Sequence, residues 1–130
     1  MKKDFRNWHA LKQAVHNDWP RVHFKEREIW FAHLGENVGY EQDGRGIAFL
    51  RPVIIIKKFN NDVFWAVPLT SHVKRAHPYY FTFSFRADRQ SSAILSQFRL
   101  LDAKRLKYKT GHVPTDMFAK IKEKIRHLLA

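Results

Sequence analysis

The sequence contains no cysteine, which excludes both disulfide bonds and thiol catalysis. It also lacks any apolar run close to the ~20 residues that a membrane-spanning helix needs, so we expect no membrane contact. The chain opens with Met1-Lys2-Lys3, but the apolar stretch of a secretory signal peptide does not follow. Together, these absences favour a protein of the reducing cytoplasm.

Acidic residues are few in comparison with basic ones. The sequence has 24 Lys and Arg residues against 12 Asp and Glu residues, which gives a formal net charge of +12. Such a balance favours a polyanionic partner over a surface that is only solvated. Charge alone does not decide between a nucleic acid and an acidic protein.

Clusters of metal-binding residues are missing as well. His9 and His16 lie seven residues apart on one face of a predicted helix, but no third ligand follows nearby. We therefore expect surface histidines, and neither a metal ion nor another cofactor.

What the sequence does have is enough apolar material for one folded domain. Its length is 130 residues, of which 45% are hydrophobic and 15% aromatic. A helix is predicted over residues 4–17, because apolar residues recur there at helical spacing: Phe5, Trp8, Leu11 and Val15. This stripe predicts a face that docks on the rest of the domain or on a second subunit.

The rest of the chain is predicted to consist of short strands and a final helix. Val53 to Ile56 form an apolar run that suits burial on both faces, and Asn60-Asn61-Asp62 indicates a hairpin turn. The predicted strands are residues 27–34, 47–58, 63–69, 79–85, 93–100 and 107–113, with a helical turn at 102–105 and a helix at 114–129. Closely spaced strands with a terminal helix indicate a mainly β (α+β) domain, a small antiparallel barrel or sandwich.

A polar, glycine-rich loop leads into the longest of these strands. Residues 39–44 read Gly-Tyr-Glu-Gln-Asp-Gly, and Arg51 and Pro52 stand near the start of the strand. The glycines give the loop backbone freedom, whereas Pro52 favours an extended conformation for Arg51. A cation on a stiff strand beside a loop suits contact with a substrate. The alternative is that Arg51 pairs with Glu41 or Asp43 and only pins the loop.

Four segments in this order resemble the PemK/MazF family of toxins from bacterial toxin–antitoxin systems. They are Glu28–Ala32, the 39–44 loop with Arg51-Pro52, Val67–Ser71, and Gln97–Asp102 with Lys104-Arg105-Leu106, followed by Gly111 and the final helix. The resemblance covers residues 26–129 of the chain.

This resemblance implies a small SH3-like antiparallel barrel at residues 26–130, preceded by an N-terminal helical extension at 1–25. It also implies a homodimer with an RNA groove across the subunit interface. Members of the family cleave single-stranded RNA without a metal ion, and a cognate antitoxin neutralises them. The implied reaction is attack of a 2′-OH on the neighbouring phosphate, which leaves a 2′,3′-cyclic phosphate and a 5′-OH end.

Arg51 and Thr70 match the residues to which the family assigns catalysis. Arginine stays protonated, so Arg51 is predicted to bind the phosphate and to stabilise charge in the transition state. The Thr70 hydroxyl is predicted to donate to a phosphoryl oxygen, with Ser71 as its substitute. The alternative for Thr70 is a hydrogen bond to a local amide at the strand end.

The remaining candidates are predicted to hold the RNA around these two residues. His72 is the candidate for proton transfer or phosphate contact, and Tyr40 or Trp30 for stacking on a base. The predicted RNA-binding residues are Glu41, Gln42, Lys57, Lys58, Ser71, His72, Lys74, Arg75 and Gln97. Each of the two glutamines has a structural alternative, which is to order the loop. The alternative for Glu41 is an ion pair with Arg51 or Lys57.

The chain also departs from the family pattern. Tyr40 stands where some members have His, and Ile94 and Ser96 stand where some members have a catalytic Arg and Asp. Two other functions therefore stay open. One is an inert barrel of the same fold that binds nucleic acid or protein, and the other is the gyrase-directed toxin that shares this fold. The Arg51-Pro52 and Thr70 segments favour the ribonuclease.

Overall fold

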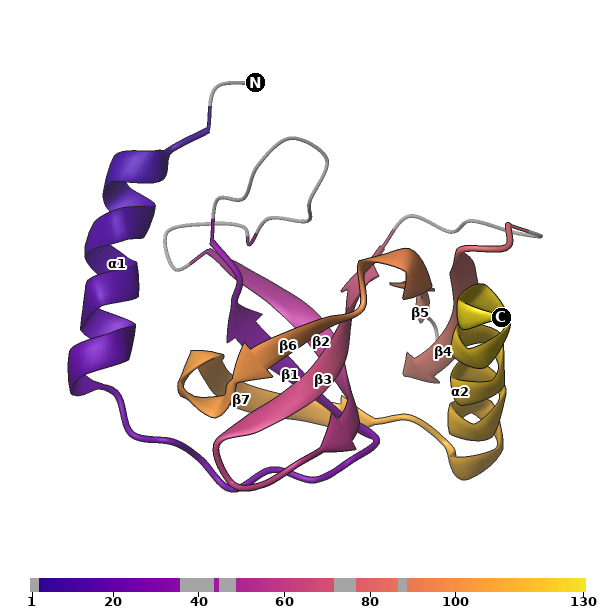
Figure 1. Ribbon diagram of the computed structural model, residues 1–130. Coiled ribbons are helices and arrows are strands. Elements are labelled where there is room, and N and C mark those ends of the chain that lie inside the picture. Colours follow the sequence, from indigo (N-terminus) through magenta and orange to yellow (C-terminus); the bar gives the residue numbers. More distant parts are fainter. Residues whose placement is uncertain (1–2, 36–43, 45–48, 72–76, 87–88) are drawn as a thin grey trace.

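A computed structural model of the chain describes residues 3–35, 44, 49–71, 77–86 and 89–130 (Figure 1). Two helices flank seven short strands. The elements are α1 (Phe5–Asp18), β1 (Glu28–His33), β2 (Leu50–Lys58), β3 (Val63–Thr70), β4 (Tyr80–Arg86), β5 (Arg89–Ile94), the 3-10 helix η1 (Leu95–Gln97), β6 (Arg99–Asp102), the 3-10 helix η2 (Ala103–Arg105), β7 (Leu106–His112) and α2 (Thr115–Leu129).

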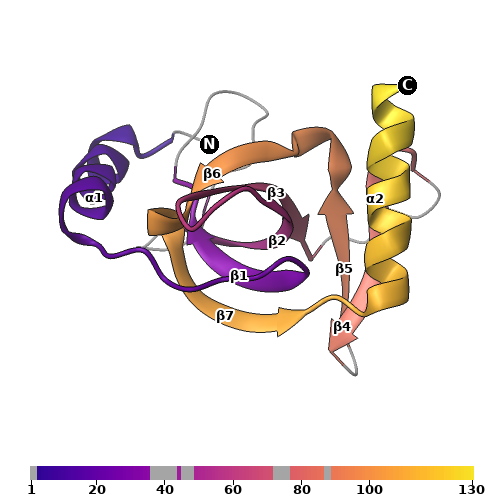
Figure 2. The ribbon, with the colours of Figure 1, turned by 60° about the horizontal axis from the view of Figure 1, so that its bottom comes forward.

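The strands form one antiparallel sheet in the order β4-β5-β3-β2-β1-β7, and β6 also pairs with β3. This sheet curves strongly, and α1 and α2 lie on opposite sides of it (Figures 1 and 2). Within the described part of the chain, η2 connects β6 to β7 but the two strands are not paired, so the sheet does not close. The prediction of a mainly β fold with a helix at each end is confirmed, and the closed barrel is corrected to an open, curved sheet.

Apolar side chains pack on both faces of this sheet. Ile54 and Ile56 of β2 belong to a first core, which includes Phe118, Ile121 and Ile125 of α2. Alternate residues of the same strand, Val53 and Ile55, belong to a second core enclosed by the curved strands. The apolar run of β2 is thus buried on both faces, as its sequence predicts.

The predicted strand at residues 93–100 is wrong, because η1 interrupts it. β5 and β6 pair one after the other with the same edge of β3. Leu69 pairs with Ala93 and Ala66 pairs with Arg99, so three residue steps on β3 face six steps on the opposite chain. The additional residues of the opposite chain must therefore leave the ladder. The Leu95 amide donates to the Tyr79 carbonyl at 2.8 Å, which turns the chain at this point.

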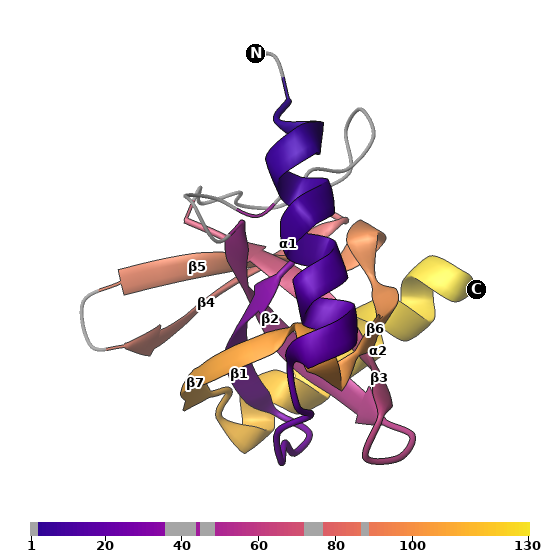
Figure 3. The same cartoon turned by 90° about the vertical axis from the view of Figure 1, so that its left-hand side faces the viewer.

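Helix α1 docks along one side of the sheet (Figure 3). Trp8 and Val15 are buried, whereas Phe5 is 53% exposed at the helix start, so the predicted docking stripe is only partly used. The Trp8 ring contacts the Phe49 ring with 5.5 Å between centroids, and the guanidinium of Arg105 lies over it. No helix in the described ranges is both long and apolar enough to span a membrane.

The segment after α1 is tied to the sheet by charge and by burial. Arg21 donates two hydrogen bonds to Asp102, at 3.0 and 2.9 Å, and lies 3.4 Å from Asp62. The Lys104 ammonium donates to the His16 carbonyl at 2.7 Å. Phe24 is fully buried in the second core, so the end of the predicted 1–25 extension packs as part of the domain.

We expect Trp8→Ala to lower the free energy of unfolding by about 3 kcal/mol, because it removes a buried ring and leaves a cavity between α1 and the sheet. Phe5→Ala on the same helix is the matched control, since that ring is largely exposed. Urea denaturation measures both. Equal, small effects for the two variants would mean that α1 does not dock through Trp8.

Acid should weaken the Arg21–Asp102 pair. Burial raises the pKa of Asp102, but hydrogen bonds from Arg21 and from the Lys104 amide outweigh it and hold this pKa below its ordinary value. The carboxylate therefore stabilises the fold at neutral pH, and this contribution is lost as the pH falls through the lowered pKa.

We expect Asp102→Asn to have a lower free energy of unfolding than the parent chain at pH 6. The difference between the two proteins should become smaller at pH 3 and below. Arg21→Gln should lower the free energy of unfolding in the same pH-dependent way. The double variant should be little less stable than either single variant, because both substitutions remove the same Arg21–Asp102 pair. Urea midpoints measured across this pH range provide the test. A gap that stays constant with pH would contradict the assignment.

Candidate functional site

The β2–β3 hairpin brings the two predicted catalytic residues together. Val53 pairs with Pro68 in its ladder, and the same register continued by two residues places Arg51 opposite Thr70. Arg51 is 7% exposed, and its Nη1 donates to the Leu69 carbonyl at 3.0 Å. Strand β3 therefore holds the Arg51 guanidinium through the carbonyl oxygen of Leu69, the residue before Thr70.

A pocket of about 360 Å³ opens at this end of the hairpin. Its lining residues are Phe31, Leu50, Arg51, Pro52, Leu69, Thr70 and Ser71. The lining thus offers one guanidinium, two neighbouring hydroxyls and an apolar wall. This set can bind an anionic group and donate to it, and in the described part of the chain it includes no carboxylate or imidazole to accept a proton.

Thr70 stands where β3 changes partner. It pairs with Ser92 of β5, while the same strand pairs with β2 on its other edge. The hydroxyl of Ser92, which is fully buried, lies 2.7 Å from that of Thr82 on β4. Strands on both sides therefore fix the backbone of Thr70, and its side chain is half-buried at the rim of the pocket.

The base of the glycine-rich loop is pinned next to Arg51. The Gly44 amide donates to the Gly35 carbonyl at 2.7 Å, and the Gly35 amide donates to the Phe49 carbonyl at 3.3 Å. A Cβ on Gly44 would collide with the backbone of Phe49, and one on Gly35 would collide with the Trp8 ring. At these two positions glycine serves close approach, whereas the sequence had suggested only freedom of the loop.

Several predicted residues lie outside the described residues. These are Tyr40, Glu41, Gln42, Asp43, His72, Lys74 and Arg75. Their roles in RNA binding, and the alternative pairing of Arg51 with a loop carboxylate, stay predictions.

Lys57 and Lys58 lie at the wrong end of the hairpin for this pocket. They pair with Trp65 and Phe64, and Lys57 is six residue steps along the strand from Arg51, or about 20 Å. The Lys58 ammonium donates to the Phe24 carbonyl at 2.8 Å and lies over the Phe24 ring. The prediction that these lysines flank the ends carrying Arg51 and Thr70 is therefore wrong.

Gln97 and Trp30 are also placed differently from the prediction. Gln97 lies in η1, not in a strand, and does not line the pocket with Arg51. Trp30 is 8% exposed in the second core, and its Nε1 donates to Glu28 at 3.0 Å, so it cannot stack on a base. Phe31 lines the pocket in its place, because β1 is buried on both faces and the tryptophan occupies the inner one.

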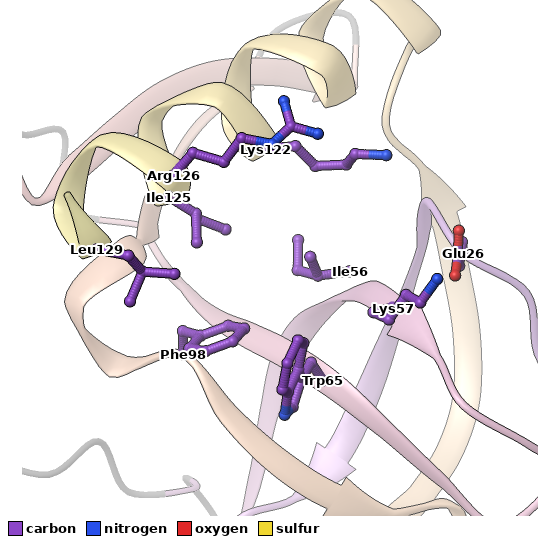
Figure 4. Close-up of a pocket in the computed structure, with 9 residues that line it drawn as sticks. All are labelled: Glu26, Ile56, Lys57, Trp65, Phe98, Lys122, Ile125, Arg126 and Leu129. Atoms are coloured by element: carbon purple, nitrogen blue, oxygen red, sulfur yellow. The ribbon is translucent and has the colours of Figure 1, made fainter.

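A second pocket of about 290 Å³ lies between α2 and the far end of the hairpin (Figure 4). Ile56, Trp65, Phe98, Ile125 and Leu129 make it apolar, and three cations surround them: Lys57, Lys122 and Arg126. Glu26 is the one carboxylate of its lining. Lys57 thus belongs to this basic pocket, which the sequence had not revealed because α2 and β2 meet only in the fold.

Within the described residues, no group of three or more His, Cys, Asp or Glu side chains is arranged to hold a metal ion. Among its described lining residues, the Arg51–Thr70 pocket offers hydrogen-bond donors to an anion.

Comparisons with known proteins agree in both sequence and fold. A family model described as PemK-like, MazF-like toxin of type II toxin–antitoxin system matches residues 25–129. No curated protein matches the sequence. Deinococcus radiodurans MazF has a TM-score of 0.64 at 18% identity, over 83% of this chain and 97% of that one.

Two further solved structures share the fold. Mycobacterium tuberculosis toxin MazF-mt6 has a TM-score of 0.60 at 16% identity, over 79% of this chain and 96% of that one. An endoribonuclease from a mycobacterial species, in complex with its cognate antitoxin, has a TM-score of 0.61 at 16% identity, over 82% and 95% of the two chains. Identities this low show likeness of fold.

Proposed function

Since this chain belongs to the PemK-like, MazF-like family of type II toxins, we propose that it is a toxin endoribonuclease that cleaves single-stranded RNA. The resemblance seen in the sequence is confirmed over nearly the same residues, 25–129. The observation that carries the proposal is that Arg51 and Thr70 line one pocket.

The reaction needs a bond change at one phosphate. The 2′ oxygen of a nucleotide attacks the adjacent phosphorus, the bond to the 5′ oxygen breaks, and a 2′,3′-cyclic phosphate and a 5′-OH remain. Negative charge builds on the non-bridging oxygens as the new bond forms. Arg51 stabilises this charge, and the Thr70 hydroxyl donates to one of the oxygens.

Protons must also move from the 2′-OH and to the leaving 5′ oxygen. Among the residues that the structure describes, those lining the pocket include no group that accepts a proton near neutral pH. His72 follows Ser71 directly in the sequence and stays our candidate for this exchange.

The partners follow from the same proposal. One solved relative is described as being in complex with its cognate antitoxin, and we propose an antitoxin for this chain too. We also propose a homodimer acting in the cytoplasm. The alternative is a catalytically inert barrel that binds nucleic acid or protein. Incubation with single-stranded RNA in EDTA, with analysis of the fragment ends, separates the two, because only the ribonuclease yields cyclic phosphates.

Arg51→Ala should lower the cleavage rate by about 10²- to 10³-fold, because a preorganised charge donor is lost. Arg51→Lys should recover little of it, since lysine lacks the forked guanidinium. Rates on a single-stranded RNA and thermal melting are measured together.

Arg27→Ala is the matched control for Arg51→Ala. Arg27 also anchors its guanidinium on a backbone carbonyl, that of Val113 at 3.0 Å, but it does not line the pocket. Its variant should cleave at the parental rate. Parental cleavage by folded Arg51→Ala would overturn the catalytic assignment.

The basic pocket at α2 is our candidate site for the antitoxin. An apolar floor ringed by Lys57, Lys122 and Arg126 suits an acidic segment that carries a large apolar side chain. RNA fits it less well, because the pocket lies at the opposite end of the hairpin from Arg51.

We expect Lys122→Glu with Arg126→Glu to weaken binding of the cognate antitoxin by about tenfold or more, through reversal of two charges at the pocket. Lys120→Glu with Lys124→Glu changes the net charge equally on the same helix, but neither residue lines the pocket. Calorimetric titration compares the two double variants. Equal losses would mean that only overall charge attracts the antitoxin.

A further inference from the structure

Three residues form a continuous apolar row across the sheet. Phe31 on β1 lies opposite Pro52 on β2 and opposite Tyr108 on β7. Directly opposite residues of paired strands point to the same face, so the three side chains lie side by side. The Phe31 and Tyr108 rings stack with 4.9 Å between centroids and 30° between planes. We call these three residues the aromatic row.

The aromatic row is the uncovered continuation of the first core. Ile29 and Ile54, two residues along their strands from Phe31 and Pro52, are fully buried in the core that includes residues of α2. At the row itself burial declines, and Tyr108 is 47% exposed on the edge strand. A large ring in this position offers a flat apolar face to solvent.

The row begins inside the candidate active site. Phe31 and Pro52 line the same pocket as Arg51 and Thr70. Neighbouring strands lie about 4.8 Å apart, so Tyr108 is roughly 10 Å from Pro52 across the sheet. A nucleic-acid chain with one phosphate at Arg51 can therefore reach this aromatic surface with a neighbouring base.

The charges beside the row favour a nucleic acid. Lys107 and Lys109 precede and follow Tyr108 on the edge strand, both are exposed, and β7 contains no carboxylate. Their side chains leave the strand on the face opposite the Tyr108 ring, along the same exposed edge. Lys109 forms an ion pair with Glu28, with 3.3 Å between the ammonium nitrogen and a carboxylate oxygen, whereas Lys107 is exposed on the same strand. An exposed ring that stacks a base, on an edge whose cations can contact the phosphates, is a combination by which proteins hold unpaired nucleotides.

We propose that Tyr108, supported by Phe31, is a stacking platform for an unpaired base of the RNA next to the cleaved phosphate. The proposal rests on the proposed function and deepens it, because it adds a binding residue to the Arg51 pocket. Every base has a π face, so this platform contributes affinity and positioning more than choice of base. Tyr108 binds the substrate and takes no part in the bond changes.

The probe is a fluorescent single-stranded oligonucleotide with 2′-O-methyl groups, which lacks the attacking hydroxyl and stays intact. We expect Tyr108→Ala to weaken its binding by about 5- to 150-fold in fluorescence anisotropy, the loss typical of one stacked base. Tyr108→Trp should keep the affinity. Tyr108→Leu should lose it while retaining apolar packing on Phe31, which separates stacking from support of the fold.

Tyr79→Ala is the matched control, because Tyr79 is 49% exposed but lies off the row. It should bind like the parent chain. Oligonucleotides with a single abasic nucleotide, placed at each position in turn, extend the test. Loss of the stacked base should weaken binding to the parent chain, and loss of the same base should not change binding to Tyr108→Ala.

Unchanged affinity in Tyr108→Ala would overturn the platform, and so would a change from dimer to monomer, which would make the row a subunit interface. If the parent chain cleaves RNA but Tyr108→Ala binds the oligonucleotide with parental affinity, the platform is wrong and the proposed ribonuclease stands. If Tyr108→Ala weakens binding but the parent chain does not cleave natural RNA, the proposed ribonuclease is wrong and the platform stands. Absence of binding by the parent chain would overturn both.

Discussion

The pairing of β2 with β3 is the constraint on which the rest of the molecule depends. One register decides which residues meet at each end of the hairpin: Arg51 and Thr70 at one end, Lys57 and Trp65 at the other. The same strands separate the two cores, and β3 also carries β5 and β6 along its other edge. A slip of one residue would turn every buried side chain of β2 to the opposite face and would separate Arg51 from Thr70. Burial of apolar side chains in the two cores thus sets the strand register that brings Arg51 and Thr70 into one pocket.

The sequence was informative wherever the relation between residues was local or came from the shared family pattern. Helical periodicity predicted α1 and α2, the Asn60-Asn61-Asp62 turn predicted the hairpin, and the family pattern brought Arg51 and Thr70 together. It failed where the outcome depended on neighbours remote in the chain. Trp30 was assigned to a surface because alternation cannot reveal that β1 is covered on both faces. Lys57 and Lys58 were placed near the site, although antiparallel pairing carries them to its far end. The η1 interruption was missed because it arises from the offset between two ladders.

Five of the 24 Lys and Arg side chains donate hydrogen bonds to the protein backbone. Carboxylates number half as many as the cations, and several cations donate instead to backbone carbonyl oxygens. Arg27, Arg51, Lys58, Lys104 and Arg105 all do so, on the carbonyls of Val113, Leu69, Phe24, His16 and His33. Burial lowers the pKa of Arg105 from its usual value, which shows that such a cation carries a desolvation cost. These five cations keep their charge, but their donors are directed at the backbone, so they have fewer donors to offer an RNA or an acidic protein.

Gly35 and Trp8 occupy the same small volume. Gly35 has a φ of 78°, and any side chain there would enter the space of the Trp8 ring. Two separate conditions therefore select glycine at position 35: the left-handed backbone, which disfavours any Cβ, and the tryptophan ring, which fills the space that a Cβ would need. A smaller residue at position 8 would remove the second condition and leave the first. Two residues that are 27 positions apart thus constrain each other through a volume that neither can share.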